Sequence, residues 1–260
     1  MSTTTSRTAS ADALETHPKG LYVLFATEMW ERFGFYTLGA MLALYLRDVE
    51  QGMGWPEEGA TTLVSNYLMF VYASPLIGGW LADKVTGYRI AIVIGAVFFA
   101  AGYFLLYLPS VGALYLALTL VVIGNGLFKP NVSTMVGNLY PDGSRLKDSA
   151  YNIFYMGINI GAFLAPLVAE AMRQRFGYRP AFTIAGAGMV VCLLIFWGYS
   201  KHITGQAKGR RVMARAAEAA KTPPREIDSV PDSKRVMALI LIFLVVIVFW
   251  MVFHQNQLTL

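Results

Sequence analysis

Seven long apolar segments constrain what this chain can fold into. They cover approximately residues 21–46, 61–80, 90–107, 111–136, 151–171, 180–200 and 236–260. A helix of about 20 apolar residues crosses the ~30 Å hydrocarbon core of a bilayer, and a helix satisfies its own backbone hydrogen bonds there. The sequence therefore predicts an all-α, multi-pass membrane protein. A secretory signal peptide is a poor alternative for the first segment, because that segment follows a polar stretch and is too long.

Composition and motif content exclude several other classes of protein. Hydrophobic residues make up 56% of the chain and charged residues 14%, which is too apolar for an ordinary soluble domain. The net charge of +5 comes from basic residues between the apolar segments, so we expect no nucleic-acid partner. The single cysteine, Cys192, allows no intrachain disulfide and no thiolate metal cluster. The chain has no zinc-protease or serine-hydrolase motif, so we predict neither an enzyme nor a metal site.

The distribution of basic residues predicts the orientation in the membrane. With the N-terminus inside, the inner segments hold Arg7, Lys19, Lys84, Arg89, Arg145, Lys147 and nine more basic residues at 201–235. The outer connections hold only Arg47, Arg173, Arg175 and Arg179. Because cytoplasmic loops retain positive charge, we predict an inner-membrane protein with a cytoplasmic N-terminus. The three arginines between the fifth and sixth segments run against this rule.

The apolar segments and the polar stretches between them divide the chain into four parts. These are a cytoplasmic segment (1–20), a six-helix bundle (21–200), a basic cytoplasmic linker (201–235) and a seventh transmembrane helix (236–260). The linker either joins two bundles or binds anionic lipid headgroups. The chain stops after the seventh helix, so we expect a C-terminal half of the same transporter to follow it.

The first apolar segment carries three charged residues. Glu28, Glu31 and Arg32 stand at i, i+3 and i+4, so they share one helix face within pairing distance, and Tyr36 extends that face by one turn. Each charge costs about 2.5 to 3.5 kcal/mol to insert, which marks such residues as functional. An arginine between two carboxylates can exchange partners when one of them is protonated. The alternative is a structural ion pair.

The fourth segment carries one cation, Lys129, directly before Pro130. Proline removes a backbone hydrogen bond, and Gly124 and Gly126 allow close helix approach, so this helix can bend beside its charge. Lys129 is therefore predicted to face a cavity or a carboxylate. The alternative is that its ammonium group extends to the membrane surface.

Three runs of sequence resemble one transporter family. Residues 28–36, Glu-Met-Trp-Glu-Arg-Phe-Gly-Phe-Tyr, are similar to the first-helix motif of the proton-dependent oligopeptide transporters, within the major facilitator superfamily. Residues 78–89 resemble the loop between helices two and three of that superfamily, and residues 151–163 resemble the family's fifth-helix signature. The resemblance extends over all seven apolar segments.

The resemblance implies a fold, an activity and a set of partners. The fold is the N-terminal six-helix bundle plus helix seven of a two-bundle transporter that works by alternating access. The activity is the import of di- and tripeptides with protons as the coupling ion and no other cofactor. The expected partners are a small peptide, the proton, the lipid bilayer and the C-terminal half. Transport of nitrate or another small organic anion stays open as a rival, as does a membrane scaffold without transport.

The resemblance also implies roles for individual residues. The proton-coupling group would be Glu28, Glu31 and Arg32, and Arg32 would also face the peptide carboxylate. The substrate cavity would be lined by Arg32, Tyr36, Tyr72, Lys129 and Asn159, and the gating loop would contain Asp83 and Arg89. Tyrosine hydroxyls and an asparagine amide can bond a peptide backbone without recognising its side chains. Without the family, the alternative for the two tyrosines is aromatic packing, and the alternative for Asn159 is an interhelical hydrogen bond.

Three positions depart from the family pattern. Phe35 replaces a tyrosine, and Gly39 stands where many members carry a second arginine. His254 stands where the family usually has an acidic residue, which leaves the proton site there in doubt. Histidine can carry a proton near neutral pH, so His254 is a candidate proton carrier, with a neutral hydrogen-bonding residue as the alternative.

Overall fold

The computed structural model describes residues 16–140, 144–203 and 231–258, which divide into two units, Met1–Gly205 and Gln206–Leu260. The division falls inside the expected linker at 201–235, of which residues 204–230 lie outside the described part. The helices of the first unit are α1 (Lys19–Arg47), α2 (Glu57–Leu81), α3 (Tyr88–Leu105), α4 (Val111–Asn138), α5 (Leu146–Phe176) and α6 (Tyr178–Gly198). A π-helical turn, η1 (Ala82–Thr86), follows α2, and a short 3-10 turn, η2 (Ser200–His202), follows α6. The second unit contains α8 (Asp232–Leu258).

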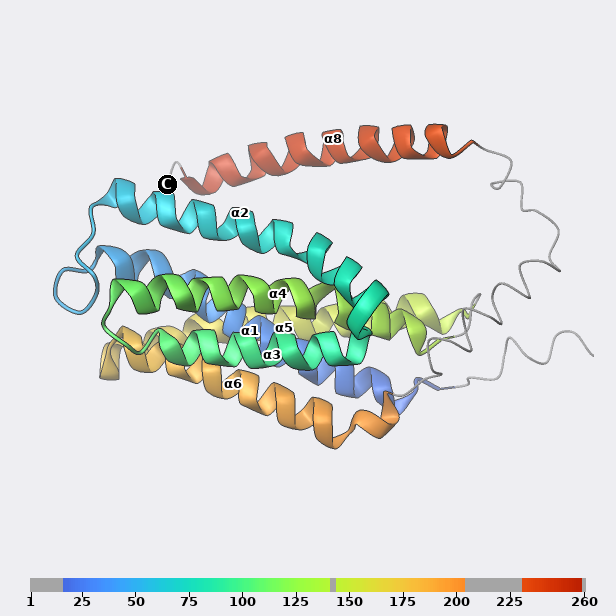
Figure 1. Ribbon diagram of the computed structural model, residues 1–260, viewed down its shortest axis with the longest axis horizontal. Helices are drawn as coiled ribbons and strands as arrows, with labels where there is room; N and C mark the ends of the chain where they lie inside the picture. Colours follow the sequence, from blue (N-terminus) through green and yellow to red (C-terminus); the bar gives the residue numbers. More distant parts are fainter. Residues whose placement is uncertain (1–15, 141–143, 204–230, 259–260) are drawn as a thin grey trace, which may run out of the picture. The chain divides into compact units, whose positions relative to one another are not determined.

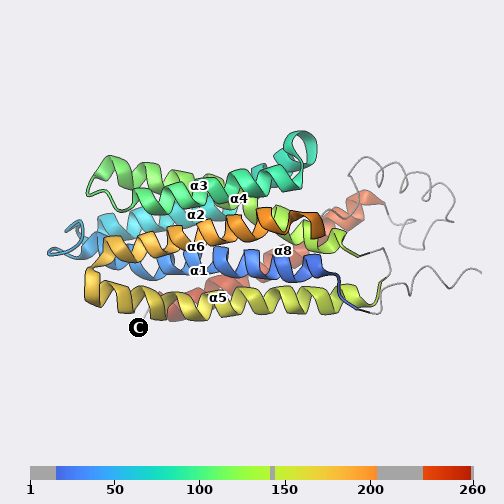
Figure 2. The same ribbon diagram turned by 90° about the horizontal axis from the view of Figure 1, so that it is seen from below.

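The six helices of the first unit form one bundle with α1 at its centre (Figures 1 and 2). Helix α1 packs mainly against α5 and α6, while α3 packs against α4 and α6. Helix α2 contacts chiefly α4, so much of its surface stays exposed within the unit. The charged candidates on α1 are thus enclosed, and the candidate on α2, Tyr72, is accessible.

Small residues bring the helix backbones into close contact. A Cβ atom at Gly78 of α2 would collide with the Gly126 carbonyl of α4, and one at Gly95 of α3 would lie 2.8 Å from the Gly124 carbonyl oxygen. At Gly161 of α5 a Cβ would collide with the backbone of α1. Lipid offers little hydrophobic driving force between helices, so association depends on such close packing.

Five helices of the described chain are long and apolar enough to span a membrane: α2 together with η1, α3, α4, α5 and α6. Helix α1 is not among them, and it is the helix that contains Glu28, Glu31 and Arg32. Its position at the centre of the bundle explains how it tolerates these charges, because its neighbours rather than lipid surround it. This pattern of helices is that of a multi-pass membrane protein.

The fifth and sixth helices differ from the expected boundaries. Helix α5 begins at Leu146 rather than near 151, and a single residue, Gly177 with φ +86°, separates it from α6. Arg173 therefore lies in the last turn of α5, where it pairs with Glu170 at 2.7 Å. Cations are favourable at a helix C-terminus, so the end of α5 accounts for Arg173 and Arg175, but not for Arg179, which lies in the first turn of α6.

Candidate functional site

The charged residues of α1 form one cluster inside the bundle. Glu31 is 0% exposed, and Glu28 and Arg32 are each 3% exposed. Arg32 Nη2 donates to Glu31 Oε1 at 2.7 Å, and Arg32 Nε bonds the second oxygen of Glu31. Arg32 Nε also lies 3.4 Å from Glu28 Oε1. The guanidinium therefore pairs with both carboxylates at once, with the stronger contact to Glu31.

The cluster is unevenly satisfied. Both oxygens of Glu31 accept bonds from Arg32, whereas Glu28 Oε2 is buried without a hydrogen-bond partner among the described residues. Two carboxylates face one guanidinium, and Lys129 is the next positive charge that acts on them. Because the cluster holds two carboxylates and one guanidinium, protonation of either carboxylate leaves Arg32 with a single charged partner.

The neighbours of Arg32 fix its position and close the cluster. The guanidinium lies over the Phe35 ring, with Cζ 4.7 Å from the ring centroid. On the opposite helix, a Cβ at Gly161 of α5 would lie only 3.1 Å from Arg32 Cβ. The three charged side chains are therefore enclosed by protein and do not face lipid. Phe35, where the family pattern has a tyrosine, contributes a cation–π contact instead of a hydroxyl.

Lys129 lies well inside α4 and points toward α2. Its Nζ is 5.7 Å from the centroid of the Tyr72 ring, and the side chain is half buried. Tyr72 is 66% exposed and Tyr36 is 39% exposed. The placement of the ammonium over an aromatic face disfavours the alternative in which it extends to the membrane surface. Tyr36 and Tyr72 lie on an accessible face of the unit rather than in its packed core.

Asn159 is exposed on α5. Its side-chain nitrogen donates to the Tyr155 carbonyl oxygen of the same helix at 2.9 Å. The alternative of an interhelical hydrogen bond therefore does not describe its arrangement here. The amide oxygen remains available to a ligand on that face.

The expected gating residues lie at the junction of α2 and α3. Asp83 is part of the π-helical turn η1 and accepts a hydrogen bond from the Tyr88 hydroxyl at 2.6 Å. Arg89 is exposed in the first turn of α3. Gly87 between them has φ +76°, a conformation that favours glycine. His254 falls within α8, but its side chain lies outside the described residues.

The sequence analysis missed three buried polar residues of the bundle, two of which interact with the cluster. Tyr67 of α2 is 5% exposed, Tyr103 of α3 is 0% exposed, and neither hydroxyl has a hydrogen-bond partner among the described residues. Both tyrosines interact electrostatically with Glu31 and Arg32. Asn125 of α4 is also buried, and it donates to α2. A single tyrosine in an apolar segment forms no recognisable pattern with other polar residues, so the sequence alone could not identify Tyr67 and Tyr103.

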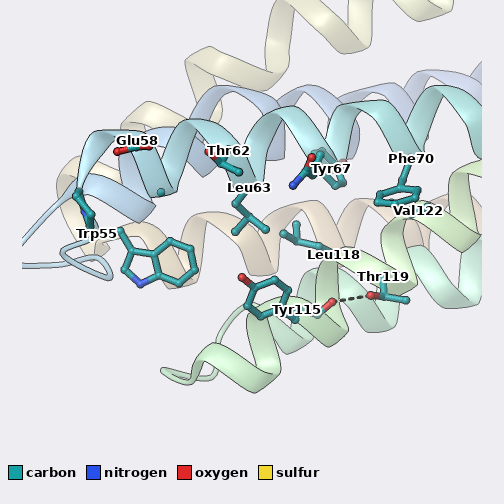
Figure 3. Close-up of a pocket in the computed structure, with 13 residues that line it drawn as sticks. Trp55, Glu58, Thr62, Leu63, Tyr67, Phe70, Tyr115, Leu118, Thr119 and Val122 are labelled. Atoms are coloured by element: carbon teal, nitrogen blue, oxygen red, sulfur yellow. Dashed lines mark hydrogen bonds between the residues drawn. The ribbon is translucent and has the colours of Figure 1, made fainter.

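A cavity of about 860 Å³ lies between α2 and α4, at the ends where both helices begin. Figure 3 shows Tyr67 on the α2 side with Leu63 and Phe70, and Tyr115 and Thr119 across from it on α4. Tyr67, a residue of this lining, also interacts electrostatically with Glu31 and Arg32 of α1. Within the first unit, the cavity approaches the cluster through this side chain.

Residues 89–222, just over half of the chain, match the model of the POT family. The chain belongs to the POT family. Its helical bundle is accordingly that of the peptide transporters of the major facilitator superfamily. POT family members transport peptides and are not enzymes.

Two curated relatives match more than two thirds of this chain. The di-/tripeptide transporter of Lactococcus lactis subsp. lactis (strain IL1403) is 33% identical over 92% of this chain and 46% of its own length. The uncharacterized transporter YclF of Bacillus subtilis (strain 168) is 42% identical over 69% of this chain and 37% of its own length. The chain therefore spans less than half the length of these relatives.

Solved POT structures share the fold. A POT family transporter in complex with a thioalcohol-conjugated peptide superposes with TM-score 0.72, is 31% identical, and is matched over 95% of this chain and 49% of its own. The peptide transporter POT in complex with sulfate superposes with TM-score 0.71, is 36% identical, and is matched over 90% and 48%. This chain matches about half the length of each of these solved chains.

Proposed function

We propose that this chain is the N-terminal half of a proton-coupled symporter that imports di- and tripeptides by alternating access. The observation that carries the proposal is the enclosed cluster in which Arg32 holds Glu31 and Glu28 together. Burying three charged residues in a membrane is energetically costly, and a scaffold that transports nothing would gain no function from them. The family membership and the peptide ligands of its relatives support the same conclusion.

The cluster provides a way to link proton and peptide binding. While both carboxylates are charged, Arg32 is held by Glu31 and Glu28. Glu31 accepts two hydrogen bonds from Arg32. When Glu31 is protonated, it loses its negative charge and releases Arg32. The guanidinium is then free to bind the carboxylate of a peptide. Arginine and carboxylate form strong, bidentate hydrogen bonds. Proton uptake and peptide binding thereby favour each other.

The remaining site residues supply contacts that do not depend on peptide sequence. Lys129 adds a second cation for a carboxylate or carbonyl group, beside the accessible hydroxyls of Tyr36 and Tyr72. The Asn159 amide is exposed on α5. These groups recognise a peptide backbone and leave its side chains unread. The C-terminal half, expected from the greater length of the relatives, would enclose the other side of the peptide.

We further propose that the N-terminus is cytoplasmic and that the protein resides in the inner membrane. The excess of basic residues at the ends of helices on that side supports this orientation. A reporter domain fused between residues 204 and 230 tests it. Protection of that reporter from an external protease is the expected result, and its digestion in intact cells would contradict the orientation.

The test of function uses the full-length transporter in liposomes. An acidic exterior or a negative interior is expected to drive accumulation of a radiolabelled dipeptide. Glu31→Gln is expected to lose this proton-driven uptake while retaining peptide exchange, because glutamine cannot take up the proton but keeps the shape of the site. Glu57→Gln is the control: it removes an exposed carboxylate at the start of α2 and should leave uptake unchanged. Full response of Glu31→Gln to the gradient would reject the coupling role.

A competition panel tests the substrate class. Di- and tripeptides should inhibit uptake of the labelled dipeptide, while nitrate should not. Free amino acids and 5-aminolevulinic acid complete the panel, the latter because the structure of a POT family relative contains it. Transport of nitrate in preference to dipeptides would favour the rival function.

A further inference from the structure

Tyr67 has an environment that the proposed function does not yet explain. Its hydroxyl is buried in the bundle and has no hydrogen-bond partner among the described residues. Buried polar groups are nearly always satisfied, so one that is not calls for an explanation. A hydroxyl that makes its bonds only during the transport cycle is such an explanation.

One side of Tyr67 faces the cavity between α2 and α4. The Tyr67 ring forms part of the cavity lining at a level between Leu63 and Phe70 (Figure 3). The opening of this cavity is bordered by polar groups, among them Glu58 and Tyr115. The cavity volume of about 860 Å³ has room for many water molecules. Water can therefore approach Tyr67 from the ends of α2 and α4.

The other side of Tyr67 faces the charge cluster. Its hydroxyl interacts electrostatically with Glu31 and Arg32 of α1, with Tyr72 of its own helix, and with Tyr103 of α3. The Tyr103 hydroxyl oxygen lies 3.4 Å from the position of a Cβ at Gly34, one helical turn from Glu31. Tyr103 is itself buried and unsatisfied. Two buried tyrosine hydroxyls thus interact with Glu31 and with each other, and one of them belongs to a residue that lines the cavity.

We infer that Tyr67 passes protons between the α2–α4 cavity and Glu31. This inference rests on the proposed function. A hydronium ion in the cavity gives a proton to the Tyr67 oxygen and becomes water, while the original hydroxyl proton moves on to the Glu31 carboxylate, directly or through Tyr103. Tyr67 ends the step as a neutral hydroxyl, and Glu31 gains one proton and loses its bonds to Arg32. With the N-terminus inside, the cavity opens toward the exterior, from which protons would enter.

The inference separates Tyr67 from residues that bind the peptide. Tyr67→Phe keeps the ring and removes only the oxygen. In the full-length transporter we expect gradient-driven dipeptide uptake to fall on the order of tenfold or more, since positioned proton-transfer groups commonly contribute larger factors. Exchange of internal for external dipeptide needs no net proton movement and is expected to stay at the wild-type rate. A loss in uptake without a loss in exchange is a result that a packing role would not produce.

Tyr115→Phe is the matched control. Tyr115 lines the same cavity from α4 but lies at its exposed border, beside Trp55. Its substitution should leave both uptake and exchange unchanged. Wild-type uptake in Tyr67→Phe would overturn the inference, and so would an equal loss of uptake and exchange.

A second measurement needs no substrate and therefore stands apart from the proposed function. After a rapid drop in pH, time-resolved infrared spectroscopy of the purified full-length transporter follows the carboxylic acid band that Glu31→Gln abolishes. Tyr67→Phe should slow the appearance of this band on the order of tenfold, while Tyr115→Phe should not. If the band appears at the same rate in the wild type, Tyr67→Phe and Tyr115→Phe, the inference is overturned even if peptide transport is confirmed. A slower rate in Tyr67→Phe supports it even if the transported substrate proves to be another molecule.

Discussion

The side-chain nitrogen of Asn125 on α4 donates to the carbonyl oxygen of Val71 on α2, at 2.7 Å. Pro75, four residues after Val71, has no N–H group, so this carbonyl lacks its ordinary helical donor. The asparagine thus replaces the missing bond from a neighbouring helix, close to the contact between Gly78 and Gly126. A proline in α2 is tolerated because Asn125 of α4, together with the Ser74 hydroxyl of α2 at 3.1 Å, satisfies the carbonyl that it leaves open.

Replacing Asn125 should destabilise the bundle. Asn125→Leu keeps a similar volume but leaves the Val71 carbonyl buried with a weaker set of partners. We expect the free energy of unfolding to fall by about 1 to 2 kcal/mol, in the range found for interhelical hydrogen bonds in membranes. Denaturant unfolding of the purified protein in mixed micelles measures it. Thr119→Val is the control, because that hydroxyl bonds only the Tyr115 carbonyl of its own helix. Equal stability of the two variants would contradict this account.

Two glycine substitutions should have opposite outcomes. At Gly161 an added Cβ collides with the Met29 carbonyl and crowds Arg32, whereas at Gly39 it has no neighbour within 4 Å. Gly161→Ala should therefore lower stability by about 1 to 3 kcal/mol, as overpacking does, and should reduce transport by displacing Arg32. Gly39→Ala should leave thermal stability unchanged or slightly raised, because alanine favours helix. A thermal shift assay of both variants decides, and a Gly161→Ala protein as stable as wild type would refute the close packing.

Removing either cation of the site should abolish transport. In Arg32→Ala the two buried carboxylates lose their shared partner, and in Lys129→Ala the site loses the cation held over Tyr72. Neither variant is expected to bind or accumulate a dipeptide in liposomes. Lys147→Ala, at the start of α5, removes one positive charge elsewhere and should retain transport. Wild-type rates in both Arg32→Ala and Lys129→Ala would exclude these residues from the peptide site.

Asp48 should contribute to stability in a pH-dependent way. The backbone amide of Gln51 donates to its carboxylate at 2.8 Å and lowers the pKa of Asp48 below its usual value, assisted by the Glu50 amide and the Tyr178 hydroxyl. A carboxyl whose pKa is lower in the folded state stabilises the protein above the unfolded pKa, about 3.9 for aspartate, and loses this contribution as the pH falls through the folded pKa.

Asp48→Asn should therefore lower the melting temperature at neutral pH. As the pH falls, the melting temperature of the variant should decrease less than that of the wild type. Melting temperatures of the wild type and the variant, measured from neutral pH down to about pH 3, should converge at the acid end. Glu50→Gln removes an acid from the same turn while keeping the contacts of Asp48, and its curve should follow the wild type. A constant difference between Asp48→Asn and the wild type over the whole range would show that charge plays no part.

The candidate site could be predicted from the sequence only in part. Glu28, Glu31 and Arg32 lie on one helix, so helical periodicity alone predicts that they meet. Lys129 and Tyr72 come from different helices, and their proximity was expected only through the family resemblance. Tyr67, Tyr103 and Asn125 were missed because each is a single polar residue in an apolar segment. What makes them important is the neighbour across the helix interface, which no local pattern records.

The sequence by itself determined the membrane class, the approximate helical segments and the charged face of α1, since these depend on hydropathy and on spacing along one chain. Only the tertiary structure decided that α1 lies at the centre of its unit, that the arginines around Gly177 belong to helix ends, and that Tyr67 both lines a cavity and interacts with Glu31. The physical reason is that helix packing is set by where small residues let backbones approach. Those contacts join residues far apart in sequence, such as Gly78 and Gly126 or Val71 and Asn125.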